Sequence, residues 1–196
     1  MDLQAFLAPL PRGDLWIFGY GSLMWAPEFR PAERSFGRLH GYHRALCILS
    51  MRYRGTLKRP GLVMGLCRGG SCWGVALRVR GPHVRATLEH LWRREMPRRV
   101  YMPRLLAVRI RGGRLVRALA FVANPEHPHF VHELALPELA RLVAQGVGER
   151  GHCVEYIANT IAHMGEIGVQ DPHLERVLEA AQALRMRRSA SSSRAR

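Results

Sequence analysis

A glutamate occupies a position where an apolar side chain is expected, at the end of a helix predicted over residues 82–96. The spacing of four apolar residues places them on one face of this helix: Val84, Leu88, Leu91 and Trp92. The next position on that face, eleven residues after Val84, is Glu95. Burial and the dipole at a helix C-terminus both disfavour a charged carboxylate. A glutamate placed in this way is suited to accept and return a proton near neutral pH.

An ion pair would also explain a buried glutamate. An isolated carboxylate is costly to bury, so it is paired, neutralised or used in chemistry. Three arginines stand close to Glu95 in the sequence, namely Arg94, Arg98 and Arg99. From periodicity alone, a structural ion pair and a general acid/base role for Glu95 both stay open.

A second candidate is the segment "WIFGYGSLMW", in which two glycines interrupt an apolar, strand-like run. Gly19 and Gly21 widen the range of backbone conformations and let a ligand approach the main chain. Successive N–H groups in such a turn can bind an anion. The segment therefore predicts a site for a ligand carboxylate or a developing oxyanion, with a simple glycine-bent strand end as the alternative.

Two better-known glycine motifs fit this segment poorly. A dinucleotide-binding G-x-G-x-x-G would need glycine at Met24 and a helix immediately afterwards. A serine nucleophile elbow, G-x-S-x-G, would need a residue between the glycine and the serine, but Ser22 directly follows Gly21.

The overall charge favours an acidic ligand. The chain has 196 residues and a formal net charge of +15, from 30 Lys and Arg against 15 Asp and Glu. Such a balance attracts nucleic acid, acidic membranes or small acidic substrates. The arginines are scattered and no nucleic-acid-binding motif accompanies them. We therefore expect no nucleic-acid partner, and keep a basic, non-catalytic nucleic-acid-binding module as the alternative from a different class.

The remaining composition points to a cytoplasmic protein. No apolar run reaches the ~18 residues of a transmembrane helix, so no membrane partner is expected. The N-terminus lacks the features of a signal peptide. The four cysteines are therefore expected to be reduced. Cys67 and Cys72 flank "RGG" and could face each other across a hairpin, which leaves a disulfide or metal role open there.

The order of the predicted elements indicates the fold class. Strands are expected at 15–18 and 38–50, and helices from 136, 153 and 172, besides the helix at 82–96. Two hairpins are predicted around glycine pairs, one joining 62–67 to 72–79 and one joining 101–110 to 115–123. Strands and helices do not alternate regularly, which favours an α+β fold with a mainly antiparallel sheet or barrel.

The domain organisation is predicted to be simple. Residues 1–14 form an N-terminal extension and residues 15–186 form one domain. Residues 187–196 form a basic, Ser/Arg-rich tail that is expected to be disordered.

Six segments, taken in order, resemble the ChaC family: "WIFGYGSLMW", "LHGYHRALC", "RGTLKRPGLVMGL", "GGSCWGVALRV", "LWRREM" and "YIANT". The resemblance runs from about Leu15 to about Leu178. This family comprises glutathione-specific γ-glutamylcyclotransferases. The resemblance implies a small β-barrel with flanking helices. It also implies cleavage of the γ-glutamyl bond of glutathione, giving 5-oxoproline and cysteinylglycine.

The resemblance also implies roles for individual residues. The catalytic glutamate of the family matches Glu95, which would serve as general acid/base while the glutamyl amine attacks its own side-chain carbonyl. Tyr156 looks like the substrate-contacting tyrosine of the family. The "YGSL" loop and the two residues before it match the substrate-binding set Phe18, Gly19, Tyr20, Gly21, Ser22 and Leu23. No cofactor or metal is needed, because the same acid/base group can protonate the leaving amine.

The sequence departs from the family pattern in two loops. Arg52 and Tyr53 stand before "RG", where family members often carry Asp-His or a similar pair. His152, Cys153 and Val154 follow Gly151, where an asparagine and polar residues are commoner. These changes leave a cyclotransferase acting on other γ-glutamyl amines or amino acids as an alternative. The sequence makes no prediction of oligomeric state.

Overall fold

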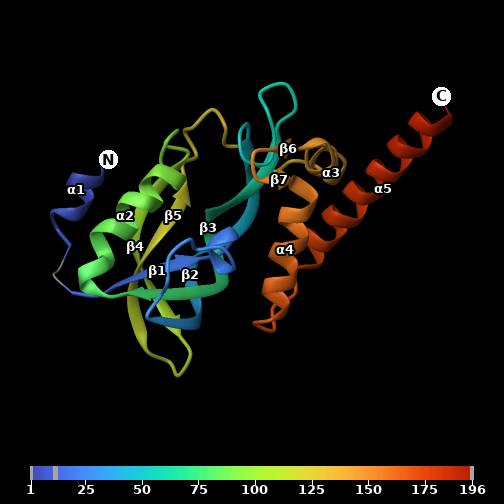
Figure 1. Ribbon diagram of the computed structural model, residues 1–196. Helices are drawn as coiled ribbons and strands as arrows, with labels where there is room; N and C mark the ends of the chain where they lie inside the picture. Colours follow the sequence, from blue (N-terminus) through green and yellow to red (C-terminus); the bar gives the residue numbers. More distant parts are fainter. Residues whose placement is uncertain (1, 11–12, 195–196) are drawn as a thin grey trace. The chain divides into compact units, whose positions relative to one another are not determined.

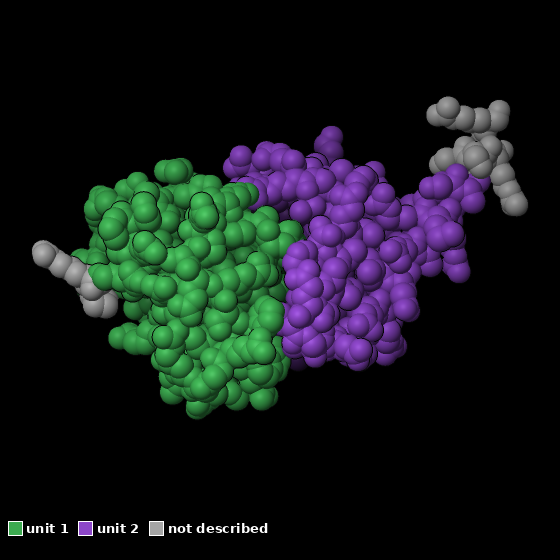
Figure 2. All heavy atoms as spheres, turned by 60° about the horizontal axis from the view of Figure 1, so that its bottom comes forward, with its two compact units in different colours: residues 1–45, 65–127 green, residues 46–64, 128–196 purple. Residues whose placement is uncertain are grey.

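The structure is a computed structural model that describes residues 2–10 and 13–194. Figure 1 shows its elements, which are, in chain order, α1 (Leu3–Leu7), β1 (Leu15–Gly19), η1 (Ser22–Met24), β2 (Glu33–Ser50), β3 (Gly61–Val79), α2 (Gly81–Glu95), β4 (Tyr101–Ile110), β5 (Leu115–Ala123), α3 (Leu136–Gln145), β6 (Val147–Gly148), β7 (Gly151–His152), α4 (Cys153–Gly165) and α5 (Pro172–Arg194). The chain divides into two compact units, coloured in Figure 2. Unit 1 comprises residues 1–45 and 65–127, and unit 2 comprises residues 46–64 and 128–196.

Five strands form a closed barrel in the order β1-β3-β2-β4-β5. β1 pairs antiparallel with β3 along its whole length, from Leu15 opposite Val79 to Gly19 opposite Val75. β1 also pairs parallel with β5, which closes the barrel. The pairs of β4 with β2 and with β5 are antiparallel. The predicted α+β fold with a small, mainly antiparallel barrel and flanking helices is therefore confirmed.

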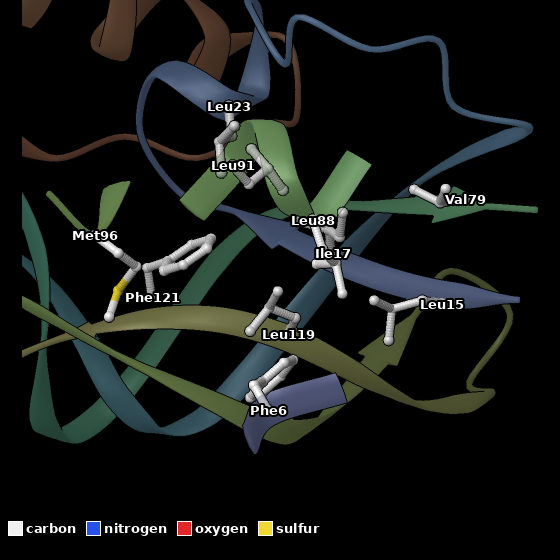
Figure 3. Packing of buried hydrophobic residues seen from close by; sticks show 10 residues of the cluster. All are labelled: Phe6, Leu15, Ile17, Leu23, Val79, Leu88, Leu91, Met96, Leu119 and Phe121. Carbon is white, nitrogen blue, oxygen red and sulfur yellow. The ribbon is translucent and has the colours of Figure 1, made fainter. Parts of the chain in front are cut away.

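The helix predicted over 82–96 is present as α2, with a proline in its first turn and Glu95 as its last residue. Leu88 and Leu91 are fully buried. Figure 3 shows them in one apolar cluster with Ile17 of β1 and Leu119 of β5. Burying a leucine side chain contributes roughly 1.5–3 kcal/mol, so this packing fixes α2 against the barrel strands of unit 1.

The N-terminal segment packs on the same helix. Phe6 of α1 belongs to the apolar cluster, and its ring centroid lies 5.0 Å from that of Trp92. Trp92 in turn makes an edge contact with Phe121 of β5. The predicted extension thus has a described helix that contributes to the core of unit 1.

The hairpin predicted around residues 68–71 is wrong, because β3 continues as one strand from Gly61 to Val79. Gly69 and Gly70 have φ angles of +95° and +67°, which bend the strand without reversing it. The four cysteines are all buried, free thiols, and Cys67 and Cys72 lie on one strand rather than on two arms of a hairpin. The second predicted hairpin is confirmed, since β4 pairs with β5 around Gly112 and Gly113.

Unit 2 contains the three C-terminal helices, which pack against one another. Asp171 begins α5 as predicted, because its Oδ1 accepts a hydrogen bond from the Leu174 N–H at 3.0 Å. Residues 187–194 continue α5, where the sequence predicted a disordered tail. The Ser189 hydroxyl donates to the Arg185 carbonyl one turn earlier. Residues 195–196 lie outside the described part. Among the described helices, none is long and apolar enough to cross a membrane.

Candidate active site

The predicted glycine loop leaves the end of β1 and closes a single helical turn. The Met24 N–H donates to the Gly21 carbonyl and the Ala26 N–H donates to the Ser22 carbonyl, both at 2.8 Å. A side chain at Gly19 would place its Cβ 3.0 Å from the backbone of Leu23. Close packing against the turn therefore favours glycine at this position. The backbone conformation does not, because the φ of Gly19 lies outside the left-handed region. Gly21 likewise has a φ of −136°.

Aromatic side chains anchor the start of this loop inside unit 1. Phe18 has no exposed surface. The Tyr20 hydroxyl donates to the Phe121 carbonyl at 2.5 Å, and the Tyr20 carbonyl accepts from Arg44 Nε at 2.6 Å. Phe18 and the ring of Tyr20 are therefore held inside unit 1, and the substrate contacts assigned to both residues stay predictions.

Leu23 fastens the other side of the turn to α2. It is buried and belongs to the apolar cluster that contains Leu91, which Figure 3 shows beside it. Met96, the residue after Glu95, belongs to the same cluster together with Phe121. Leu23 of the predicted loop and Met96, next to the predicted acid/base residue, thus belong to one apolar core.

Glu95 lies mostly buried, with 17% of its side chain exposed, as the apolar stripe of α2 predicted. Its Oε1 lies 2.9 Å from Nε of Arg94. The ion pair that the sequence left open is therefore present. A neighbouring cation favours the charged form of a carboxylate, which is the form that can accept a proton.

Arg94 is the most buried of the charged side chains at this site, with 5% exposed. Its Nη2 donates to the Ser22 hydroxyl oxygen and its Nη1 to the Ala26 carbonyl, both at 2.7 Å. The same Nη1 lies 3.5 Å from Oε1 of Glu28, whose Oε2 is 2.9 Å from His90 Nε2. One guanidinium thus connects the end of α2 to the glycine loop.

Sequence reasoning did not predict two of these contacts, the bond of Arg94 to the glycine loop and that of Arg44 to the Tyr20 carbonyl. Arg94 was considered only as an ion-pair partner of Glu95, although its place beside that residue was the available signal. Arg44, which binds the Tyr20 carbonyl and also the Trp73 carbonyl at 2.7 Å, carries no signal in the pattern of its own strand.

Tyr156 belongs to unit 2, on α4, and is therefore described with that unit alone. Its hydroxyl oxygen accepts from the Met64 N–H at 3.1 Å, and the Arg54 guanidinium lies 5.4 Å from the centre of its ring. Burial lowers the pKa of Arg54 and raises that of the nearby Cys153 thiol to about 11. The substrate contact assigned to Tyr156 stays a prediction.

The described residues hold no group of three or more His, Cys, Asp or Glu side chains placed to bind a metal ion. In unit 1 the buried Arg94 guanidinium brings together the carboxylates of Glu95 and Glu28, the Ser22 hydroxyl and the main chain of a tight turn. This set can transfer a proton and stabilise a negative charge.

Several known proteins are similar to this chain in sequence. The chain is 36% identical over 184 residues to the glutathione-specific gamma-glutamylcyclotransferase of Escherichia coli (strain K12), covering 93% of this chain and 80% of that protein. It is 33% identical over 184 residues to the human glutathione-specific gamma-glutamylcyclotransferase 1, covering 88% of this chain and 83% of that protein.

Solved structures share the fold. A yeast gamma-glutamyl cyclotransferase specific to glutathione superimposes with a TM-score of 0.81 at 20% identity, over 88% of this chain and 97% of that one. The family described as ChaC-like protein matches residues 15–184, a range that includes the glycine loop, Arg94, Glu95 and Tyr156. With most of its length matched in this way, the chain belongs to the ChaC family.

Proposed function

We propose that this chain is a γ-glutamylcyclotransferase that converts glutathione into 5-oxoproline and cysteinylglycine. Membership of the ChaC family supports the reaction, and the printed names of the bacterial and human relatives support glutathione as the substrate. The net charge of +15 suits a substrate that carries carboxylates. The observation that carries the proposal is the carboxylate of Glu95, linked through one arginine to the glycine loop.

The reaction is an internal displacement. The α-amine of the γ-glutamyl group attacks the carbonyl carbon at the end of its own side chain, which forms a new C–N bond and closes a five-membered ring. The bond from that carbon to the cysteinyl nitrogen breaks. One proton leaves the attacking amine and one reaches the departing nitrogen, so a single acid/base group completes the balance. Because both reacting atoms belong to one molecule, orientation supplies much of the acceleration.

Glu95 is the proposed acid/base group. It accepts the proton of the attacking amine and delivers it to the leaving nitrogen. Its mostly buried carboxylate and its place at the C-terminus of α2 suit this role, because both disfavour a permanent negative charge, while Arg94 offsets part of that effect.

The glycine loop is the proposed anion site. The first N–H groups of a helical turn have no partner inside the turn, and in this turn they are those of Ser22 and Leu23, within the segment Gly19–Leu23 that the sequence singled out. They would bind the α-carboxylate of the substrate or the oxyanion that forms at the attacked carbonyl. Tyr156 is the further residue proposed to position the substrate.

The test is the release of 5-oxoproline from glutathione by the purified protein and by Glu95→Gln. We expect release by the wild type and loss of most turnover in the variant, because the amide cannot accept the proton. Thermal unfolding of the variant serves as the control for folding. Full activity in a folded Glu95→Gln variant would contradict the assigned base.

The same assay decides the substrate. γ-Glutamyl amino acids and γ-glutamyl amines are offered beside glutathione at equal concentration. A higher kcat/KM for one of them would replace glutathione as the substrate while keeping the reaction. Absence of 5-oxoproline from every γ-glutamyl compound would contradict the reaction and favour the alternative of a basic binding protein.

A further inference from the structure

We propose that Arg94 is a positioning residue, whose guanidinium holds Glu95 and the hydroxyl of Ser22 in the relative placement that the cyclisation needs. This inference rests on the proposed function and extends it to a residue that acts through its two neighbours. Its basis is that one buried side chain bonds both the acid/base residue and the glycine loop.

The geometry leaves the Arg94 side chain little freedom. Its three nitrogens each have an acceptor: Nε has Glu95 Oε1 at 2.9 Å, Nη2 has Ser22 Oγ at 2.7 Å, and Nη1 has the Ala26 carbonyl at 2.7 Å. A guanidinium is planar and its N–H directions are fixed. Three acceptors around a planar group therefore fix the carboxylate of Glu95 against the turn that contains Ser22.

This arrangement decides what Ser22 can do. A hydroxyl has one proton to donate and two lone pairs that accept. Because Arg94 donates to the oxygen, that bond leaves the hydroxyl proton for another acceptor. We assign this proton to the carbonyl oxygen of the substrate as it gains negative charge, where a fixed donor accelerates the reaction more than it tightens ground-state binding.

The surroundings of Arg94 also limit how far its charge weakens Glu95 as a base. A carboxylate that faces a cation alone would be a weak base. Here the guanidinium also faces Glu28, at 3.5 Å, and Glu28 is held from its other oxygen by His90. One positive charge is thus shared by two carboxylates, so Glu95 is oriented by Arg94 and still able to accept a proton.

The neighbouring arginine of the same helix supplies a matched control. Arg93 lies in the same last turn of α2 and its side chain is exposed. Replacing Arg93 removes one positive charge from the same helix end without touching Ser22, Ala26 or Glu95.

The first experiment compares Arg94→Ala, Arg94→Lys and Arg93→Ala with the wild type for kcat, KM and melting temperature. We expect Arg94→Ala to lower kcat by about 100-fold, a loss that misplacing reacting groups by about 1 Å can cause, with a much smaller change in KM. Arg94→Lys retains the charge, but its compact ammonium cannot match three acceptors that are spaced around a planar guanidinium, so we expect at least a tenfold loss. Arg93→Ala should keep the wild-type kcat.

A chemical rescue separates positioning from folding. Guanidinium ion at millimolar concentration should restore part of the kcat of Arg94→Ala, whereas urea, which is similar in shape but neutral, should not. Should Arg94→Ala fail to fold, the folded Arg94→Lys variant decides. Wild-type kcat in either folded Arg94 variant, or equal responses to guanidinium and urea, would overturn the inference.

The outcomes for the two proposals are distinguishable. An active wild type with inactive Glu95→Gln but fully active Arg94 variants would refute only the role of Arg94. A wild type that forms no 5-oxoproline from any γ-glutamyl compound would refute the proposed function, and the role of Arg94 with it.

Discussion

Two arginines of unit 1 each face two carboxylates, but of these two only Arg94 also bonds the glycine loop. Arg94 faces Glu95 and Glu28 with 5% of its side chain exposed. Arg78 of β3 faces Asp14 and Glu33 with 30% exposed. Water competes for the bonds of Arg78 and screens its charges, whereas the bonds of Arg94 form where water is largely excluded. Although each arginine has two carboxylate partners, we therefore expect the ion pairs of Arg94 to contribute more to stability and to fix their partners more firmly.

The largest difference should appear in stability when each arginine is replaced by methionine. Removing one partner from a buried ion pair leaves charges uncompensated, so we expect Arg94→Met to lower the free energy of unfolding by about 3 kcal/mol. Arg78→Met should cost much less, because exposed ion pairs contribute little. Urea unfolding of both variants measures the difference, and equal losses would show that burial is not what distinguishes the two arginines.

A pair of serines extends the comparison of buried and more exposed arginines from ion pairs to hydrogen bonds. Ser22 accepts from the buried Arg94, whereas Ser71 accepts two N–H groups, at 3.0 and 2.8 Å, from Arg38, which is only half-buried. We expect Ser22→Ala to cost about 1.5 kcal/mol, as for a hydrogen bond to a charged group, and Ser71→Ala to cost less. A larger loss for Ser71→Ala in the same urea titration would reverse the proposed order.

Salt should separate the two arginines by a smaller amount. Dissolved ions screen exposed charges strongly and buried charges weakly. The difference in unfolding free energy between the wild type and Arg78→Met should shrink as sodium chloride is raised, whereas the difference for Arg94→Met should change little. Parallel responses of the two variants would contradict the contrast in exposure.

The smallest expected effect is the pH dependence contributed by Asp14. Hydrogen bonds from Arg78 and from the Gly81 N–H hold the pKa of Asp14 below its ordinary value of 3.8. A depressed pKa in the folded state stabilises the fold above the unfolded value and loses that effect as the pH falls through the folded value. Wild type and Asp14→Asn should therefore differ in unfolding free energy at neutral pH and converge in acid below about pH 4. A difference that persists unchanged at lower pH would exclude this titration.

Two identical glycine motifs show how far local sequence decides the fold. "RGG" occurs before Ser71 and again before Arg114, and both were predicted to be hairpin turns. At Gly112–Gly113 the flanking segments pair with each other, so the prediction is correct. At Gly69–Gly70 the following segment pairs with β1 instead, so the strand only bends. Turn chemistry permits a reversal, but distant partners decide whether it occurs.

In the candidate site, too, local sequence predicts some features, whereas distant partners decide others. The 3.6-residue period of α2 was enough to place Glu95 on the mostly buried face. It could not indicate the burial of Arg94, because the atoms that bind its guanidinium, on Ser22 and Ala26, lie 72 and 68 residues away in the chain. The barrel was predicted from the family resemblance, which depended on the order of six short segments. No single segment was enough to predict it.

The parallel pairing of β1 with β5 has a consequence for how the chain folds. Trp16 lies opposite Ala118, so about half of the chain separates the two partners that close the barrel. Contacts of this kind are formed late, since their loop-closure entropy must be overcome before they contribute stability. During synthesis, β1 therefore leaves the ribosome as a fully apolar strand well before either of its neighbours exists. We expect nascent chains that stop short of β5 to expose this strand and to depend on chaperones, while completion of β5 releases them.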